Sequence, residues 1–316
     1  MENSRREFIK KTAVATSMAS LASSPLNLWA GAKANDSLSI HIFSKHLQFL
    51  DHQAVGEQAA AIGFDGVDLT VRPGGHVEPE KVVSDLPKAI ELIKKGGSTC
   101  QMMVSGISNA KHATDISVIK TAGDNGIKFY RPKYFKYSEG KSMVEQMAEF
   151  KQQAKEISLL NKKYGIVASY QNHAGNNYVG AAMWEIFQLM EKVDQNYYGS
   201  QYDIRHSVVE GGESWETGLR LVRPHIKTIV LKDFKWGKVN GQWKHINTPM
   251  GEGMVSFKRY FALLKKYKIN VPVSLHLEYP LGGANKGKRE LTIDKKDVYK
   301  AMKKDLTIAR RLWAEA

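Results

Sequence analysis

From Leu38 to the C-terminus, short apolar runs alternate with longer amphipathic segments. Apolar runs with little polar alternation predict strands of a parallel sheet that is buried on both faces. Eight runs fit this description: Leu38–Phe43, Gly66–Val71, Thr99–Val104, Ile127–Arg131, Ile166–Gln171, Gly199–Ile204, Lys227–Lys232 and Val271–Glu278. The segments after them have helical periodicity: His46–Ile62, Pro79–Lys95, Asp115–Asn125, Lys141–Tyr164, Gly180–Val193, Trp215–Val222, Ser256–Tyr267 and Lys296–Trp313. Eight alternating units predict an α/β fold, a single closed (β/α)8 barrel.

Loop patterns support the barrel over an open dinucleotide-binding sheet. No G-x-G-x-x-G opens a helix after the first strand. The segment from Trp236 to Met254 is longer than an ordinary strand–helix loop, and Lys238–Trp243 reads as a hairpin around an Asn-Gly turn. We expect this hairpin to form a wall or lid at the barrel mouth.

The N-terminus resembles an export signal. Ser4–Lys10 has a twin-arginine pattern, a weakly apolar run follows, and Ala32–Ala34 fits a small-x-small cleavage site. This pattern predicts a signal peptide over residues 1–34, a barrel domain over residues 35–316, and a periplasmic or otherwise exported protein. No membrane span is expected after signal removal. The single cysteine, Cys100, excludes an intramolecular disulfide and sits in an apolar run typical of a core.

The chain is basic, with a net charge of +14. The first 34 residues hold five Lys or Arg and two Glu, so residues 35–316 keep 41 basic and 30 acidic residues, a net charge of +11. Many lysines fall within the amphipathic helices, where they are best explained as solvated faces. Because no basic run interleaves with aromatic residues, we do not expect nucleic-acid binding.

Ionisable side chains gather where the predicted strands end. The carboxyl ends of barrel strands meet at one face, which is where barrel enzymes place their sites. Glu278, at the end of the last strand, is the first candidate for a catalytic base. Asp203 and His206 form a carboxylate–imidazole pair suited to a divalent metal or a proton relay. Lys232 could bind a substrate oxyanion or act as a base.

Other residues at these ends are candidates for substrate binding. Arg72 precedes Gly74 and Gly75, which suits a loop that approaches a ligand closely, and His76 follows them. Gln171, Asn172 and His173 end the fifth strand, where they could bind hydroxyl groups or complete a metal shell.

Several of these segments together resemble the sugar phosphate isomerase/epimerase family, the xylose-isomerase-like barrels grouped with the family-2 apurinic endonucleases. The segments that carry the resemblance are Gly63–Leu69, Gln171–His173, Asp203–His206, Ile229–Asp233, Gly251–Gly253 and Glu278. The resemblance covers the whole chain after the leader. It implies a xylose-isomerase-like barrel that acts on a small carbohydrate.

The resemblance also implies a divalent metal, such as Mn, Zn or Mg. In the family, a Glu after strand five, an Asp or His after strand six, a His on strand seven and a Glu after strand eight hold the ion. Here these positions carry Gln171, Asp203, Val230 and Glu278, so two of four match. His173 or His206 could replace the missing imidazole, and with His206 the metal set would be Asp203, Glu278, Gln171 and His206.

Three functions remain open at this stage. The first is a sugar or keto-sugar isomerase or epimerase that transfers a proton next to a carbonyl, with Glu278, Lys232 and His206 as the catalytic residues. The second is a lyase or hydratase that acts on 3-ketoglycosides by elimination or hydration. The third is a barrel that binds carbohydrate without catalysis.

Overall fold

Eight parallel strands close into a barrel, as the sequence pattern predicts. The computed structural model describes residues 37–316, so the predicted leader lies outside the described residues and stays a prediction. The barrel strands are β1 (Ile40–Phe43), β2 (Gly66–Val71), β3 (Met102–Ser105), β4 (Phe129–Arg131), β5 (Val167–Gln171), β6 (Tyr198–Asp203), β7 (Ile226–Leu231) and β10 (Val273–Leu275). They pair in the order β1-β10-β7-β6-β5-β4-β3-β2, and all these pairs are parallel.

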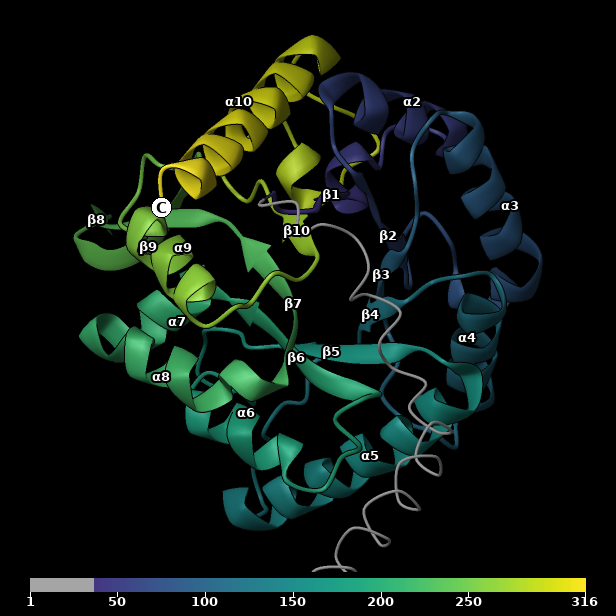
Figure 1. Cartoon of the computed structure of the whole chain (residues 1–316), viewed down its shortest axis with the longest axis vertical. Coiled ribbons are helices and arrows are strands. Elements are labelled where there is room, and N and C mark those ends of the chain that lie inside the picture. Colours follow the sequence, from purple (N-terminus) through teal and green to yellow (C-terminus); the bar gives the residue numbers. More distant parts are fainter. Residues whose placement is uncertain (1–36) are drawn as a thin grey trace, which may run out of the picture. The chain divides into compact units, whose positions relative to one another are not determined.

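Helices surround the strands as a ring (Figure 1). They are α2 (His52–Ile62), α3 (Val82–Lys95), α4 (Ala113–Asp124), α5 (Met143–Tyr164), α6 (Met183–Met190), α7 (Ile204–Gly211), α8 (Trp215–Val222), α9 (Phe257–Lys266) and α10 (Lys295–Ala314). Local signals set their ends. The Asp51 side chain caps α2 by accepting from the Ala54 N–H, and Gly63 ends the helix with a φ of 98°.

Two differences from the sequence prediction affect the mouth of the barrel. The helix α7 was not expected, because it starts directly after β6, and Asp203 serves as both the last strand residue and the helix N-cap. Strand β10 ends at Leu275 rather than at Glu278. The chain leaves the ladder there because the N–H of Leu277 donates to Nε2 of His46, 3.0 Å away, instead of to a neighbouring strand.

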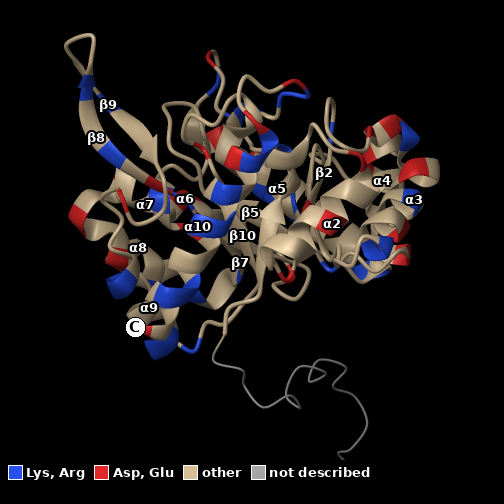
Figure 2. Cartoon of the chain, turned by 90° about the horizontal axis from the view of Figure 1, so that it is seen from above, with Lys and Arg blue, Asp and Glu red and all other residues tan. Residues whose placement is uncertain are grey.

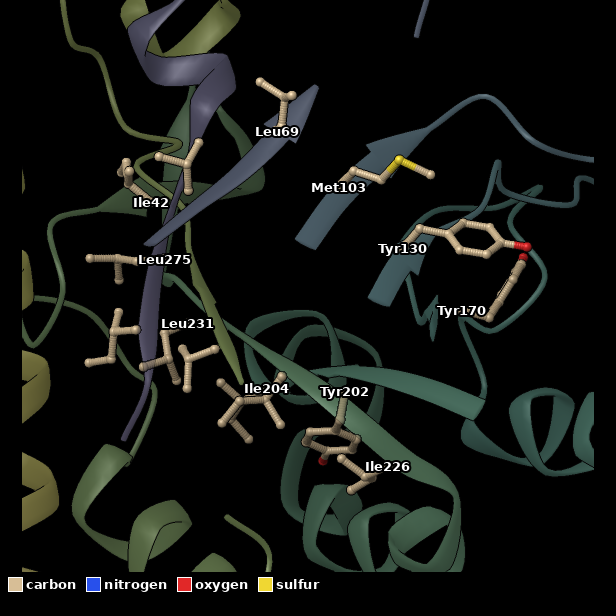
Figure 3. Close-up of a cluster of buried hydrophobic side chains, with 14 of the residues drawn as sticks. Ile42, Leu69, Met103, Tyr130, Tyr170, Tyr202, Ile204, Ile226, Leu231 and Leu275 are labelled. Carbon is tan, nitrogen blue, oxygen red and sulfur yellow. The ribbon is translucent and has the colours of Figure 1, made fainter. Parts of the chain in front are cut away.

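The outward face of the barrel is apolar and aromatic. Side chains alternate between the two faces of each strand, and one set packs in the layer between strands and helices. This layer includes Ile42, Leu69, Met103, Tyr130, Tyr170, Tyr202, Leu231 and Leu275 (Figure 3). The hydroxyl of Tyr130 donates to Oδ1 of Asn161 on α5 at 2.9 Å, so even the polar tip of this ring is satisfied.

The opposite set of side chains, inside the barrel, is unusually polar. Barrel interiors are normally filled by branched apolar residues. Here they include His41, Asp68, Thr70, Ser169 and Ser274, all of which are buried. The hydroxyl of Ser274 donates to Oδ2 of Asp68 at 2.6 Å, and Nε2 of His276 lies 3.1 Å from the same hydroxyl. A polar chain therefore runs from the barrel interior up to its mouth.

Asp68 makes stability depend on pH. Burial raises the pKa of this carboxyl to about 6 from 3.8, although the Ser274 hydrogen bond and the charges of Arg131 and Arg72 act in the opposite direction. Because the folded state holds the proton more tightly, this contribution to stability is complete below pH 3.8 and is lost as the pH rises through about 6.

We expect Asp68→Asn, which cannot ionise, to raise Tm at pH 8 and to change it little at pH 4. Thermal unfolding at both pH values measures this difference. An equal shift at both would show that the effect comes from packing.

The predicted hairpin is confirmed. Strands β8 (Asp233–Val239) and β9 (Gln242–Thr248) pair antiparallel, and Asn240 and Gly241 both have positive φ, as a tight hairpin turn requires. The hairpin projects beyond the ring of helices (Figure 2). Its β9 strand supplies His245 and Asn247 to the lining of the cavity at the barrel mouth. The hairpin therefore forms part of the wall of that cavity.

The Gly251–Gly253 motif has a structural explanation. The carboxylate of Asp233 accepts from the backbone N–H groups of Gly251 and Gly253, both at 2.9 Å, and thereby holds this loop under the hairpin. A Cβ on Gly253 would lie 2.3 Å from Oδ1 of Asp233, so a side chain there cannot fit without displacing the carboxylate.

Within residues 37–316, none of the helices combines the length and the apolar character that crossing a membrane needs.

Candidate active site

A cavity of about 310 Å³ opens at the carboxyl ends of the barrel strands. Its size suits a monosaccharide-sized ligand. It is lined by Phe43, Lys45, Arg72, Arg131, Tyr134, Gln171, His173, Arg205, His206, Lys232, His245, Asn247, His276 and Glu278. A larger groove of about 500 Å³ lies around α6, α7 and α8, and its ionisable lining residues are Glu210, Arg220 and Arg223 alone, whereas the smaller cavity collects lysine, arginine, histidine and glutamate side chains. The chemistry therefore points to the smaller cavity.

Asp203 is the buried centre of one side of the site. Its Oδ2 accepts from Nε2 of Gln171 at 2.7 Å and lies 3.1 Å from Nζ of Lys232. Its Oδ1 accepts from the backbone N–H of His206 at 3.1 Å, which is the helix cap of α7. The carboxylate thus ties the ends of β5, β6 and β7 together.

Asn172 positions Asp203 from behind. Its Oδ1 accepts from the Asp203 N–H at 2.7 Å, and its Nδ2 donates to the Asp203 carbonyl at 3.0 Å. Both groups of the amide are therefore engaged with one backbone residue. Because Asn172 does not line the cavity, its place in the structure is that of a support rather than the substrate contact that the sequence suggested.

His206 and Lys232 form the polar wall beside Asp203. Nζ of Lys232 lies 2.8 Å from Nε2 of His206, and the backbone N–H of Ala174 donates to Nδ1 of the same ring at 3.1 Å. Burial, followed by the charge of Lys232, lowers the pKa of His206 well below its usual value. His173 packs on His206 with ring centroids 4.0 Å apart, and burial lowers its pKa to about 3. Both imidazoles are therefore neutral near pH 7.

Glu278 follows β10, the neighbour of β7 in the barrel, and lines the same cavity. Nζ of Lys45 donates to its Oε1 at 2.8 Å, and Nδ1 of His276 lies 3.7 Å from the same oxygen. Burial alone would raise the pKa of Glu278, but contact with His276 and the charges of Lys232 and Lys45 outweigh burial and hold this pKa well below the usual range. The carboxylate is consequently ionised near pH 7.

Gln171 connects the Asp203 side to the aromatic wall. While Nε2 donates to Asp203, Oε1 accepts a hydrogen bond from the hydroxyl of Tyr134. Burial raises the pKa of Tyr134 to about 12, so its phenol stays protonated. An amide suits this position because it must donate on one side and accept on the other, which a carboxylate cannot do.

The structure brings together most of the residues that the sequence singled out. Glu278, Lys232, His206, Arg72, Gln171 and His173 line the cavity, and Asp203 lies directly behind Lys232. His76 does not join them. Its Nδ1 lies 3.0 Å from Oγ1 of Thr70, and its backbone N–H donates to the same oxygen, so the loop turns this ring away from the mouth.

Other lining residues were not singled out from the sequence. Lys45, Arg131, Tyr134, Arg205 and His276 stand at strand ends but carried no assigned role. The alternation of side chains along a strand could have indicated Arg131. Phe129 and Arg131 lie two residues apart on β4, so they face the same side of the strand. His245 and Asn247 had no such signal. Nη2 of Arg205 donates to Oδ1 of Asn247 at 2.8 Å, and this contact joins the hairpin to the barrel.

The comparisons with known proteins agree with this architecture. The sequence pattern of the xylose isomerase-like TIM barrel family matches residues 56–295. The chain therefore belongs to the xylose isomerase-like TIM barrel family. No protein of curated function matches it in sequence.

Solved structures of similar fold include several sugar epimerases. D-psicose 3-epimerase from Clostridium cellulolyticum, solved with D-tagatose, superimposes with a TM-score of 0.66 at 14% identity, over 87% of this chain and 99% of that one. The 3-keto-D-glucoside 4-epimerase from E. coli has a TM-score of 0.63 at 12% identity, over 87% and 99%. A xylose isomerase-like barrel from Mycobacterium smegmatis, solved with magnesium, has a TM-score of 0.60 at 11% identity, over 85% and 98%. At these identities, the likeness shows the fold.

The side chains at this mouth do not fit a divalent metal centre. Among residues 37–316, no group of three or more His, Cys, Asp and Glu side chains is placed to hold an ion. The two carboxylates that match the family's metal positions each have a lysine ammonium beside them: Lys232 beside Asp203 and Lys45 beside Glu278. A cation in either place would have to displace a positively charged group. The metal set of Asp203, Glu278, Gln171 and His206 is therefore not assembled in this structure.

We expect the purified protein to hold no stoichiometric divalent metal. Elemental analysis of protein purified without chelator measures this directly. Addition of Mn, Mg or Zn should leave Tm unchanged, because only an ion that binds the native state stabilises it. About one tightly held ion per chain that is lost in Glu278→Ala would contradict this prediction.

Proposed function

We propose that this protein is a sugar or keto-sugar isomerase or epimerase that transfers a proton next to a carbonyl group without a divalent metal. The observation that carries the proposal is the placement of an ionised carboxylate, Glu278, in the same monosaccharide-sized cavity as the Lys232–His206 pair. The fold-level likeness to D-psicose 3-epimerase and 3-keto-D-glucoside 4-epimerase supports the same class of chemistry.

In this proposal Glu278 takes the proton from the carbon beside the carbonyl. The C–H electrons move into the new C–C double bond, and the carbonyl electrons move onto oxygen to give an enediolate. A lysine ammonium stabilises the charge that develops on that oxygen. Return of the proton from Glu278 to the former carbonyl carbon, with transfer of the neighbouring hydroxyl proton to the enediolate oxygen, gives an isomer. Protonation of the original carbon from the other face, which needs a second proton donor on that face, gives an epimer.

Lys45 tunes the base. Its hydrogen bond to Glu278 weakens the carboxylate as a base in the free protein. A substrate oxygen that accepts from Lys45 competes for that ammonium and leaves Glu278 more basic. Substrate binding would then activate the residue that removes the proton.

The number of carboxylates narrows the choice between reactions. Glu278 is the one carboxylate among the residues that line the cavity, and the place of a second is taken by Gln171, which cannot accept a proton near pH 7. Transfer between neighbouring carbons on one face needs a single base. Elimination or hydration at a 3-keto sugar also needs one base, and the same observation makes it the second candidate.

Solvent deuterium exchange tests the proposal whichever sugar is the product. The protein is incubated in D2O with a panel of ketoses, aldoses and 3-keto glycosides, and proton NMR follows the signal of the hydrogen beside the carbonyl. Exchange together with a new sugar signal supports isomerisation or epimerisation, and exchange with an enone signal supports elimination. Binding of a sugar with no exchange across the panel would favour a barrel that binds carbohydrate without catalysis.

A further inference from the structure

Positive charge dominates the cavity. Five of its lining residues are basic, namely Lys45, Arg72, Arg131, Arg205 and Lys232, whereas Glu278 is the one acid. If Asp203 is counted as the partner of Lys232, and Asp68 is counted because its charge acts on Arg72 and Arg131, five basic groups face three carboxylates, which leaves a formal excess of two positive charges. A neutral sugar would not compensate this excess.

Three of these basic groups, Arg72, Arg131 and Arg205, form no ion pair with a carboxylate within residues 37–316. Arg205 instead donates to Oδ1 of Asn247 on the hairpin, so Arg72 and Arg131 remain for a ligand. Arg131 is buried, with 6% of its surface exposed; its Nη1 donates to the carbonyl of Pro132 at 3.1 Å, and its guanidinium lies 4.5 Å from the centre of the Tyr134 ring. Arg72 is half-buried, and its guanidinium lies 5.7 Å from the centre of the Phe43 ring. Aromatic faces satisfy such groups only in part.

The two guanidinium groups also act on each other. Burial, and then the charge of Arg131, lower the pKa of Arg72. The Asp68 carboxyl, buried inside the barrel, relieves them only in part: its charge acts on both, but its Oδ2 accepts from Ser274 and it forms no ion pair with any residue that the structure describes. Two like charges that are partly desolvated in one cavity are costly unless an anion joins them.

We infer that Arg72 and Arg131 form an anion site that binds the carboxylate of a sugar acid, such as a uronate or a keto-aldonate. The planar fork of a guanidinium matches a carboxylate in two-point hydrogen bonds. The inference rests on the proposed function, because it names the class of sugar that the proton-transfer site takes. It places the acid group toward β2 and β4 and the reacting carbons toward Glu278 and Lys232.

The position of the pair favours a carboxylate over a phosphate ester. Barrels that bind phosphate do so with the loops after strands seven and eight and with the N-terminus of a helix. Here Arg72 follows β2 and Arg131 ends β4. The N-terminus of α7 is capped by the Asp203 carboxylate, which already accepts from the His206 N–H.

Calorimetric binding of matched sugars tests the inference. The probes are D-glucuronate with D-glucose, D-galacturonate with D-galactose, and D-fructuronate with D-fructose, with D-glucose 6-phosphate as the phosphate probe. We expect at least one sugar acid to bind about tenfold or more tightly than its neutral counterpart, as a charge-assisted hydrogen bond requires. No preference for any acid, or tighter binding of the phosphate ester than of every uronate, would overturn the inference.

Variants localise the effect. Arg72→Gln should weaken binding of the preferred acid about tenfold more than it weakens binding of the neutral sugar. Arg131→Gln should do the same, with its fold verified by Tm. The matched control is Arg311→Gln, an exposed residue of α10 that changes the net charge equally. If Arg311→Gln weakened binding as much as Arg72→Gln, the general positive field would explain the preference and the site would be rejected.

The binding measurements and the exchange measurements can reject the anion site and the proposed function separately. A preference for sugar acids without deuterium exchange on any of them would retain the anion site and reject proton transfer. Exchange on neutral sugars without preference for acids would retain the proposed function and reject the anion site.

Discussion

Replacing Glu278 by Gln should lower the rate of deuterium exchange and of turnover by about 10³-fold, within the range that a general base contributes. Gln keeps the size and the carbonyl oxygen of the side chain, so Lys45 retains a hydrogen-bond acceptor. It cannot take up a proton. Binding of the sugar should therefore survive while the chemical step is lost.

The measurement compares the exchange rate and the binding constant of Glu278→Gln with those of the wild type on the sugar found in the D2O screen. Glu216→Gln is the matched control, since its carboxylate pairs with Arg259 on the outside of the barrel. Exchange by Glu278→Gln within about tenfold of the wild-type rate would reject Glu278 as the base. Loss of binding together with exchange would instead assign it to substrate binding.

The second large effect is expected on stability. Asp203→Asn removes the charge that Lys232 faces at 3.1 Å in a fully buried position, and it turns one acceptor into a donor beside Nε2 of Gln171. Breaking a buried ion pair on one side costs about 3 kcal/mol or more, because the remaining charge stays buried. For a domain of this size, that cost lowers Tm by roughly 6–12 °C.

Thermal unfolding followed by circular dichroism measures this loss, again with Glu216→Gln as the control. The exposed Glu216–Arg259 pair should contribute little, since solvent screens it. The double variant Asp203→Asn, Lys232→Met removes both partners, and we expect it to recover part of the lost stability. If Asp203→Asn unfolded at the wild-type temperature, the ion pair with Lys232 would not be what holds these three strand ends together.

The period of the sequence pattern was sufficient for the barrel. The eight apolar runs correspond to the eight barrel strands. Strand β2 (Gly66–Val71) and helix α8 (Trp215–Val222) have the predicted bounds. The sequence pattern did not predict helix α7, because its eight residues follow β6 without a loop and no break in the pattern marks its start. Strand β10 was overextended because buried residues just beyond it, such as Leu277, continue its apolar pattern although the pairing has ended.

The candidate site was predictable in part, for a related reason. Charged residues at strand ends must meet at one mouth in a closed parallel barrel, so Glu278, Asp203 and Lys232 were found from order alone. Spacing says nothing about which of them touch. Asn172 and His76 carry equally suitable side chains, yet one holds the backbone of Asp203 and the other is bound to Thr70.

By itself, the sequence determined the fold class, the face that carries the site and the departure from the family's metal positions at Gln171 and Val230, because these depend on residue type, order and period. Only the tertiary structure decided that Lys232 lies beside Asp203 and Lys45 beside Glu278, the two carboxylates that match the family's metal positions. It also decided that Arg72 and Arg131 reach one cavity without carboxylate partners among the described residues. Such pairings depend on distances between strands that lie far apart in the chain, and on which buried charges find a partner once the barrel has closed.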